Sequence, residues 1–427
     1  MDRKPTRWMK LDNAALIYPA TMNRNWTALF RISATLTDPI DPDILEVAQR
    51  CALKRCPSFS VKLRWGAFWF YLEHSEETPK IQPDVGNPCV RMRLKDNDGF
   101  GLRVRYDQNR IAIEFFHVLA DGTGGLVLLQ TLLAEYLRIK YGATIPRSAM
   151  VLDCSVPPKP EESEDSFTKH SGDYCQSRKE SKAYHIRGTD EIGGFINIVT
   201  GTIPVFELME KARTKNVSVN EYLTAVMILS IDAIQRRRVL LKKWYKPVKI
   251  CVPINLRRFF PSVTLRNFAS YVNPGIDPRL GLYTFDEVLN IVHHFMAMEV
   301  TAKLLNTKFT TNVRTQENPL LRATPLFLKN AAMKLVYSQV GDAVSSTCLS
   351  NLGIVTLPDA MAKYVNRMDF ILGPLAKNRV CAAAMSYQGL LRLNFTRTIE
   401  EPVLEKEFFT RLVKLGIHVK IESNQQD

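Results

Sequence analysis

The sequence predicts an α/β protein of the α+β type, built from two lobes of similar size. Two observations support this fold class. Stretches with strand-like alternation and stretches with helical periodicity are mixed in both halves of the chain. Between the halves, residues 153–190 are rich in proline and polar side chains, which is typical of a linker or a long exposed excursion. We therefore divide the chain into an N-terminal lobe (residues 1–152), a polar segment (153–190) and a C-terminal lobe (191–427).

The length and composition indicate a globular protein with a sizeable core. The chain has 427 residues, of which 46% are hydrophobic and 23% charged. A chain of this length exceeds one ordinary domain, and one this apolar offsets its ordering entropy by burial. Its apolar stretches are shorter than the roughly 20 residues that span a bilayer. No apolar region follows the basic Met1–Pro5 segment. We expect a cytoplasmic monomer without a membrane span.

Each lobe is predicted to hold a mostly antiparallel sheet with flanking helices. Asp41 is typical of a cap before a helix over residues 42–55. A long apolar helix is expected over residues 123–141, before Gly142. Alternation predicts strands in the first lobe at 28–36, 60–64, 67–74, 91–95, 101–106 and 110–116.

The second lobe repeats this mixture. Ser218 and Glu221 have the spacing of a capping box at the start of a helix. Helices are predicted at 204–214, 219–238, 284–305, 325–340 and 401–415. Strands are predicted at 194–203, 246–254, 345–357, 366–373, 380–385, 390–397 and 417–421.

The charge and the cysteines narrow the possible partners. The formal net charge is +14, which favours anionic partners such as a phosphate-bearing thioester. No zinc finger, RNP-like run or basic region with heptads is present, so we expect no nucleic acid. None of the eight cysteines forms a Cys-x-x-Cys pair, and no cysteine–histidine cluster has zinc spacing. We expect reduced thiols and no metal.

His117 is the strongest candidate for a catalytic residue. The apolar strand 110–116 leads into it, and Asp121-Gly122 then turns the chain into a helix. A histidine at a strand end before such a turn points into a cleft, and imidazole has the pKa that suits a general base near neutral pH. The alternative interpretation is a buried core histidine beside an incidental turn. Asp121 either orients His117 or holds the loop, and Gly122 suits a backbone position that a Cβ would obstruct.

The run His-Val-Leu-Ala-Asp-Gly at residues 117–122 resembles the His-x-x-x-Asp-Gly signature of the chloramphenicol-acetyltransferase-like superfamily. This group includes condensation domains, plant BAHD enzymes, polyketide-associated acyltransferases and alcohol acetyltransferases, and the resemblance covers nearly the whole chain. Residues 252–262 are similar to a Pro-Val-Asn-Leu-Arg segment, and residues 350–353 to a Ser-Asn-x-Gly strand. Phe116 stands where condensation domains carry another histidine, and residues 369–373 only faintly match the BAHD box. The chain therefore most resembles bacterial alcohol-acetyltransferase-like proteins.

The resemblance implies two chloramphenicol-acetyltransferase-like lobes with an active-site tunnel between them. It implies that His117 is the general base, and that Asp121 holds the loop through an ion pair with an arginine. Arg257 lies in the matching Asn-Leu-Arg segment and is the expected partner; the alternative is a surface charge. Ser350 and Asn351 are either donors to the oxyanion of a tetrahedral intermediate or part of an ordinary turn.

The implied function is transfer of an acyl group from acyl-CoA, as a co-substrate, to a small alcohol or amine. No covalent acyl-enzyme and no permanently bound cofactor are expected. Two alternatives remain open at this point. An acyl or peptidyl carrier protein, which presents an acidic surface, is a second possible donor. The third interpretation is a non-catalytic binding protein that keeps the scaffold.

Overall fold

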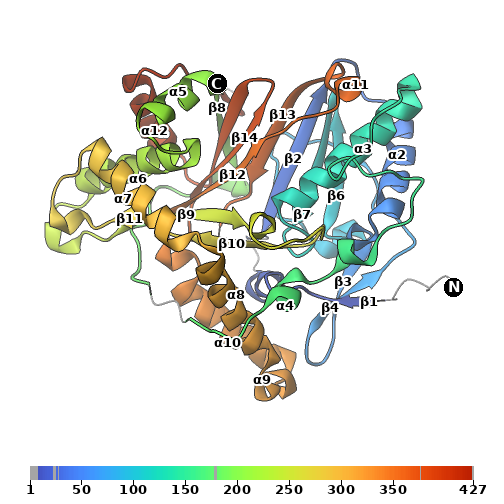
Figure 1. Cartoon of the computed structure of the whole chain (residues 1–427), viewed down its shortest axis with the longest axis horizontal. Coiled ribbons are helices and arrows are strands. Elements are labelled where there is room, and N and C mark those ends of the chain that lie inside the picture. Colours follow the sequence, from blue (N-terminus) through green and yellow to red (C-terminus); the bar gives the residue numbers. More distant parts are fainter. Residues whose placement is uncertain (1–7, 23–25, 27, 177–179, 376, 426–427) are drawn as a thin grey trace.

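The computed structural model describes residues 8–22, 26, 28–176, 180–375 and 377–425, so Met1–Pro5 lie outside it (Figure 1). The strands are β1 (Trp8–Lys10), β2 (Leu29–Leu36), β3 (Val61–Trp65), β4 (Phe70–His74), β5 (Gln82–Pro83), β6 (Leu102–Asp107), β7 (Arg110–Phe116), β8 (Asn197–Pro204), β9 (Val248–Asn255), β10 (Ala269–Val272), β11 (Gly275–Ile276), β12 (Thr347–Ile354), β13 (Val365–Leu372), β14 (Val380–Tyr387), β15 (Leu390–Arg397) and β16 (Lys420–Ser423). The α-helices are α1 (Ile17–Thr21), α2 (Pro42–Arg55), α3 (Gly122–Tyr141), α4 (Ser166–His170), α5 (Val205–Thr214), α6 (Val219–Arg238), α7 (Phe285–Glu299), α8 (Ala302–Glu317), α9 (Pro319–Ala323), α10 (Leu326–Val340), α11 (Asp359–Ala362) and α12 (Val403–Lys414).

Two large sheets form the centres of the two lobes. The N-terminal sheet has the strand order β13-β2-β7-β6-β5, and the C-terminal sheet has the order β10-β9-β12-β14-β15-β8-β16. A smaller sheet, β1-β4-β3, extends the first lobe. Helices α2 and α3 lie together beside the N-terminal sheet (Figure 1). Each lobe has its own cluster of buried apolar side chains, so the α/β fold class is confirmed.

The predicted C-terminal end of α3 and the predicted start of α6 are confirmed, and Asp121 defines the start of α3. The side chain of Asp121 accepts a hydrogen bond from Gly124 N, and so caps α3. Gly142 ends this helix at φ +62°, a left-handed conformation that glycine adopts without steric cost. Ser218 and Glu221 form the predicted capping box of α6.

Two predicted elements are wrong. Residues 91–95 do not form a strand; they lead into a 3-10 helix at Leu94–Asn97. Their alternation arises because this loop buries Met92 and Leu94 while Arg93 is exposed. The single helix predicted over 284–305 is two helices, α7 and α8, because Thr301 starts a new helix by accepting a hydrogen bond from Leu304 N.

The division of the chain at residues 191–427 also needs a correction. Strand β13 belongs to that range, yet it pairs with β2 in the N-terminal sheet, from Val365 opposite Leu36 to Leu372 opposite Phe30. Local periodicity predicts a strand but not its partner, so the sequence does not reveal this crossover. The C-terminal sheet is mixed and mostly antiparallel, as predicted, and its parallel pairs are those of β12 with β9 and with β14.

The polar segment 153–190 is packed at its middle. Glu162 forms a buried ion pair with Arg55 of the first lobe at 2.5 Å. Phe167 on α4 lies in the second core, against the rings of Phe268 and Phe309. The excursion therefore ties the two lobes together. Among the described residues, no single helix is long and apolar enough to cross a membrane; α5 and α6 satisfy that test only as a pair bent by 85°.

Candidate active site

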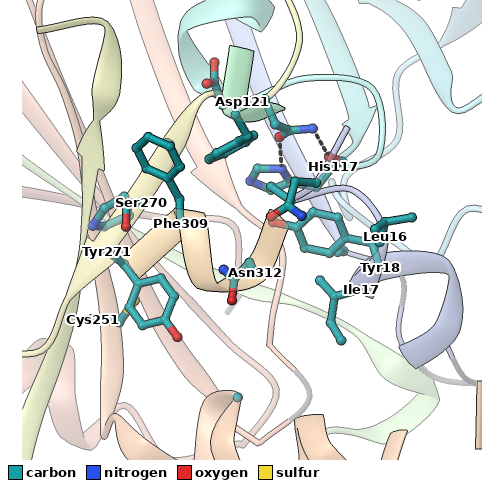
Figure 2. Close-up of a pocket in the computed structure, with 18 of the residues that line it drawn as sticks. Leu16, Ile17, Tyr18, His117, Asp121, Cys251, Ser270, Tyr271, Phe309 and Asn312 are labelled. Carbon is teal, nitrogen blue, oxygen red and sulfur yellow. Dashed lines mark hydrogen bonds between the residues drawn. The ribbon is translucent and has the colours of Figure 1, made fainter. Parts of the chain in front are cut away.

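His117 follows β7 directly, at the end of the N-terminal sheet. Its backbone N–H donates to Ala28 O at 2.8 Å, which fixes the loop at this strand end. Its ring stacks on Tyr18 with centroids 4.8 Å apart and meets the edge of Phe30 at 5.2 Å (Figure 2). These contacts fix the plane of the imidazole within the wall of a cavity.

The side chain of Asn267 determines which nitrogen of His117 carries the proton. Its amide Nδ2 donates to Asp12 Oδ2 at 3.1 Å and to the carbonyl oxygen of His117 at 3.0 Å, which fixes the amide orientation. Asn267 Oδ1 then faces His117 Nδ1 at 3.0 Å and can only accept. The neutral ring therefore carries its proton on Nδ1, and the lone pair is on Nε2.

Burial sets the charge of these side chains. Burial lowers the pKa of His117 below its ordinary value of 6.5; hydrogen bonds to its own carbonyl group and to Asn267, and the charge of Asp121, oppose that shift. Burial also raises the pKa of Asp12 to about 6, against the attraction of the Arg266 guanidinium, whose Nε lies 3.6 Å from Asp12 Oδ2. At neutral pH the imidazole is thus uncharged and able to accept a proton.

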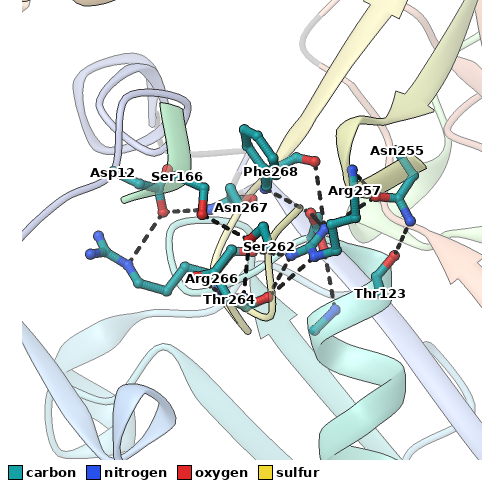
Figure 3. Close-up of polar contacts among 12 residues, drawn as sticks. Asp12, Thr123, Ser166, Asn255, Arg257, Ser262, Thr264, Arg266, Asn267 and Phe268 are labelled. Atoms are coloured by element: carbon teal, nitrogen blue, oxygen red, sulfur yellow. Dashed lines mark hydrogen bonds and ion pairs between the residues drawn. The ribbon is translucent and has the colours of Figure 1, made fainter. Parts of the chain in front are cut away.

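Asp121 is held by an arginine and by backbone N–H groups. Besides capping α3, it accepts hydrogen bonds at Oδ2 from Arg257 Nη1 at 2.7 Å and from Phe268 N at 2.8 Å. Arg257 in turn donates to the carbonyl oxygens of Thr264 and Arg266 at 2.8 and 2.7 Å (Figure 3). The structure thus brings Asp121 and Arg257 together as a largely buried ion pair that fixes one loop of each lobe.

The glycines after Asp121 allow a close approach between the lobes. A Cβ on Gly122 would lie 2.5 Å from Leu352 Cδ2, on β12 of the second lobe. A Cβ on Gly124 would lie 1.9 Å from the carbonyl oxygen of Leu265. The first contact is with a flexible side chain and the second is with backbone, so Gly124 tolerates a side chain even less than Gly122 does.

One cavity of about 1370 Å³ lies against both lobes. His117 and Asp121 line it from the first lobe, and Ser350 and Asn351 line it from β12 of the second. Asn351 Oδ1 accepts a hydrogen bond from Gly353 N at 2.8 Å, so this side chain also shapes the end of its strand. The remaining lining is mostly apolar and includes aromatic side chains from several elements: Trp26, Phe30, Phe70, Phe167, Phe309 and Phe370.

Sequence reasoning missed three residues of this site: Asp12, Tyr18 and Asn267. Asn267 lies in the loop between Arg257 and β10, within no motif that we recognised. Asp12 and Asn267 are 255 residues apart in the chain, so no local pattern connects them. No group of three or more histidine, cysteine, aspartate or glutamate side chains suited to a metal occurs among the described residues.

No family model and no curated protein sequence matches this chain. Solved structures match it over nearly its whole length. It aligns with TRI101 of F. sporotrichioides, complexed with coenzyme A and T-2, at a TM-score of 0.62 and 11% identity, covering 98% of this chain and 100% of that one. It aligns with polyketide synthase associated protein 5 from Mycobacterium tuberculosis at a TM-score of 0.59 and 14% identity, covering 95% of this chain and 97% of that one. With the starter condensation domain of rhizomide synthetase, complexed with C8-CoA and Leu-SNAC, the TM-score is 0.60 and the identity 12%. That alignment covers 96% of this chain and 93% of the other.

The fold follows from these alignments. The chain has the two-lobed fold of condensation domains and chloramphenicol-acetyltransferase-like acyltransferases. This is the fold that the resemblance at residues 117–122 implies.

Proposed function

We propose that this protein transfers an acyl group from acyl-CoA to a hydroxyl or amine, with His117 as the general base. One observation carries the proposal. His117 has Nδ1 engaged by Asn267 at 3.0 Å and lies in the wall of a large apolar cavity between the lobes, so its Nε2 lone pair is available to a substrate there. A neutral imidazole in this tautomer is what proton removal from an acceptor requires.

The reaction needs no other titrating side chain. The acceptor oxygen or nitrogen attacks the thioester carbonyl carbon while Nε2 of His117 takes its proton. The tetrahedral intermediate then collapses, the carbon–sulfur bond breaks, and the imidazolium returns that proton to the leaving thiolate. The carboxylate of Asp121 takes no part in these steps, because it is committed to Arg257 and to two backbone N–H groups. No covalent acyl-enzyme forms.

Ser350 and Asn351 are our candidates for stabilising the oxyanion. Both line the cavity on β12, opposite the lobe of His117. The hydroxyl of Ser350 and the amide N–H groups of Asn351 are donors that suit a developing negative charge. Removal of one such donor costs about 100-fold or more in turnover where it contacts the oxyanion.

The charge around the cavity suits a phosphate-bearing donor. Lys10, Arg258, Arg322 and Lys329 are among its lining residues, and the chain as a whole has a net charge of +14. Cationic side chains bind phosphate groups by charge-assisted hydrogen bonds. Two of the structures similar to this chain contain a coenzyme A species, which supports acyl-CoA as the co-substrate.

The cavity favours larger substrates than a small alcohol. Its volume of about 1370 Å³ exceeds the roughly 300–1,000 Å³ of common ligand pockets. Its apolar aromatic lining suits a lipophilic acceptor, a long acyl chain, or both.

The test is a matrix of donors and acceptors. Acyl-CoA thioesters of increasing chain length are incubated with pooled apolar alcohols and amines, and released thiol is measured with a thiol reagent. We expect release that depends on the acceptor, and an ester or amide product by mass spectrometry. An acyl-carrier protein charged with the same acyl group serves as the competing donor. Turnover with the carrier alone would replace acyl-CoA as the donor, and no turnover with either would contradict the proposal.

A further inference from the structure

One surface of the protein exposes many large apolar side chains. It is formed by β1, the tip of the β3–β4 hairpin and helices α9 and α10, and we call it the apolar rim. Leu320 is 80% exposed and Phe327 is 71% exposed. The other large apolar side chains exposed on the apolar rim are Trp8, Trp65, Phe68, Trp69, Leu321, Leu328, Leu335 and Val336.

The parts of the apolar rim are joined to one another. Leu326 N, at the start of α10, donates to Ala67 O in the hairpin at 2.9 Å, and Lys329 Nζ donates to Phe68 O at 2.8 Å. Strand β1 pairs with β4, which brings Trp8 beside the hairpin. Helices α9 and α10 lie at the lower end of the molecule in Figure 1, where they protrude below both large sheets.

The active-site cavity opens at the apolar rim. Trp8, Phe68, Trp69, Leu321 and Val336 line the cavity, yet each is also substantially exposed to solvent. A side chain that both lines a cavity and faces solvent lies at its mouth. The same cavity reaches His117, so the apolar rim surrounds an entrance to the candidate active site.

In the helical part of the apolar rim, the charged residues are all positively charged. Residues 318–341 contain Arg322, Lys329 and Lys334 and no aspartate or glutamate. Three of the five tryptophans of the chain are on the apolar rim, and each is about half exposed. Exposed aromatic and aliphatic side chains among cations are the composition of segments that bind in the interface of anionic membranes.

We propose that the apolar rim docks on a membrane that carries anionic lipids, so that the cavity opens directly onto the bilayer. Apolar side chains of α10 and the hairpin enter the headgroup region, while Arg322 and Lys334 contact lipid phosphates. A lipophilic substrate then reaches the cavity without crossing water; this delivery rests on the proposed function, whereas the docking does not.

Other occupants fit the apolar rim less well. An acidic carrier protein is attracted by cations, but most of the exposed side chains here are uncharged and apolar. A second copy of this chain would bring two positively charged surfaces together, which like charges oppose. Both remain outcomes that the experiment detects.

The experiment is flotation of the full chain with phospholipid vesicles. We expect the protein to float with vesicles of phosphatidylglycerol and phosphatidylcholine, and to float weakly with phosphatidylcholine alone. The test variant is Phe327→Asp with Leu328→Asp. These positions lie in the first turn of α10, where acidic side chains stabilise a helix, and neither lines the cavity. We expect vesicle affinity to fall about tenfold or more.

A matched control changes two leucines elsewhere that are more exposed than the test positions. Leu280→Asp with Leu282→Asp adds the same charge at positions 81% and 82% exposed, before α7. We expect its vesicle affinity to stay within about twofold of the wild type, and Lys334→Gln to lower affinity about fivefold. Equal binding by test and control variants, or no wild-type flotation, would overturn the proposal.

Light scattering without lipid covers the remaining occupants. A wild-type dimer that the Phe327→Asp/Leu328→Asp variant converts to a monomer would assign the apolar rim to a second copy. Binding to an acidic carrier protein but not to vesicles would assign it to that partner. Either result would overturn membrane docking. Acyl transfer to water-soluble substrates, measured on the same samples, reports separately on the proposed function.

Discussion

His117 and Asp121 lie four residues apart in one loop, and the structure treats them differently. Both oxygens of Asp121 are occupied, by Gly124 N, Phe268 N and Arg257. Among the described residues, the hydrogen bond to the ring of His117 is that of Nδ1 with Asn267, and the ring lines the cavity. One polar residue of the motif is thus built into the fold, and the other is oriented but left able to react.

The two residues nevertheless depend on one segment of the second lobe. Arg257, which holds Asp121, and Asn267, which orients His117, are at the two ends of the same loop before β10. Arg257 also fixes that loop internally through Thr264 and Arg266. The ion pair and the tautomer of His117 thus share one supporting loop, yet they differ in what their loss would do. Substitutions can separate these two roles.

The largest effect is expected at His117. His117→Ala should lower turnover by roughly two to four orders of magnitude, the usual contribution of a general base. The thermal unfolding midpoint should change little by comparison, because the ring packs mainly at the cavity wall. Thiol release and circular dichroism on the same preparation check both parts. An alanine variant that retains full turnover would remove His117 from the mechanism.

Loss of the ion pair between Asp121 and Arg257 should instead act mainly on stability. Arg257→Met leaves Asp121 buried and without its cation, which we expect to cost about 3 kcal/mol of unfolding free energy. Urea denaturation measures this cost. Arg258→Met, at the exposed neighbouring position, is the control and should change stability by less than about 0.5 kcal/mol. Similar midpoints for the two variants would show that the pair does not hold the lobes.

Asn267→Leu should lower turnover, but by less than His117→Ala does. It removes the acceptor that keeps the proton on Nδ1, so kcat should fall about tenfold while KM changes little. The hydrogen bond to Asn267 raises the pKa of His117, so its loss should move the acidic limb of the rate profile to lower pH. A merely structural role for Asn267 would lower activity without moving that limb.

The smallest effect is the pH dependence of the wild type. Because burial lowers the pKa of His117, kcat/KM should fall on acidification with a midpoint below 6.5. The same shift affects stability. In the unfolded chain His117 binds its proton near pH 6.5, and in the folded chain it does so only at lower pH. The contribution of neutral His117 to the free energy of unfolding is therefore present above pH 6.5 and is lost as the pH falls through the folded pKa. A midpoint above 6.5 would indicate another titrating group.

Much of the fold was predictable because its signals are local. The strand before His117, the capping box at Ser218 and the helix stop at Gly142 each depend on a few neighbouring residues. The partnership of Asp121 and Arg257 was predictable only through a resemblance, because 136 residues separate them. The strand prediction at residues 91–95 was wrong because a loop that buries alternate side chains has the same pattern as a strand.

The rest depends on contacts that no local pattern records. Strand β13 was predicted as a strand, but its pairing with β2 follows from the tertiary arrangement. Asn267 and Asp12 are polar residues in loops, where such residues are common. Only their meeting beside His117 distinguishes them. The apolar rim likewise combines segments that are far apart in the chain.

The central claim is that His117 at neutral pH carries its proton on Nδ1 and leaves Nε2 free to take one from the acceptor. The ¹⁵N chemical shifts of the His117 ring, assigned by comparison with His117→Ala, measure this directly. We expect a protonated Nδ1 and a bare Nε2 at neutral pH, persisting below pH 6.5. A proton on Nε2 at neutral pH would contradict it, because such a ring has no lone pair to offer the substrate.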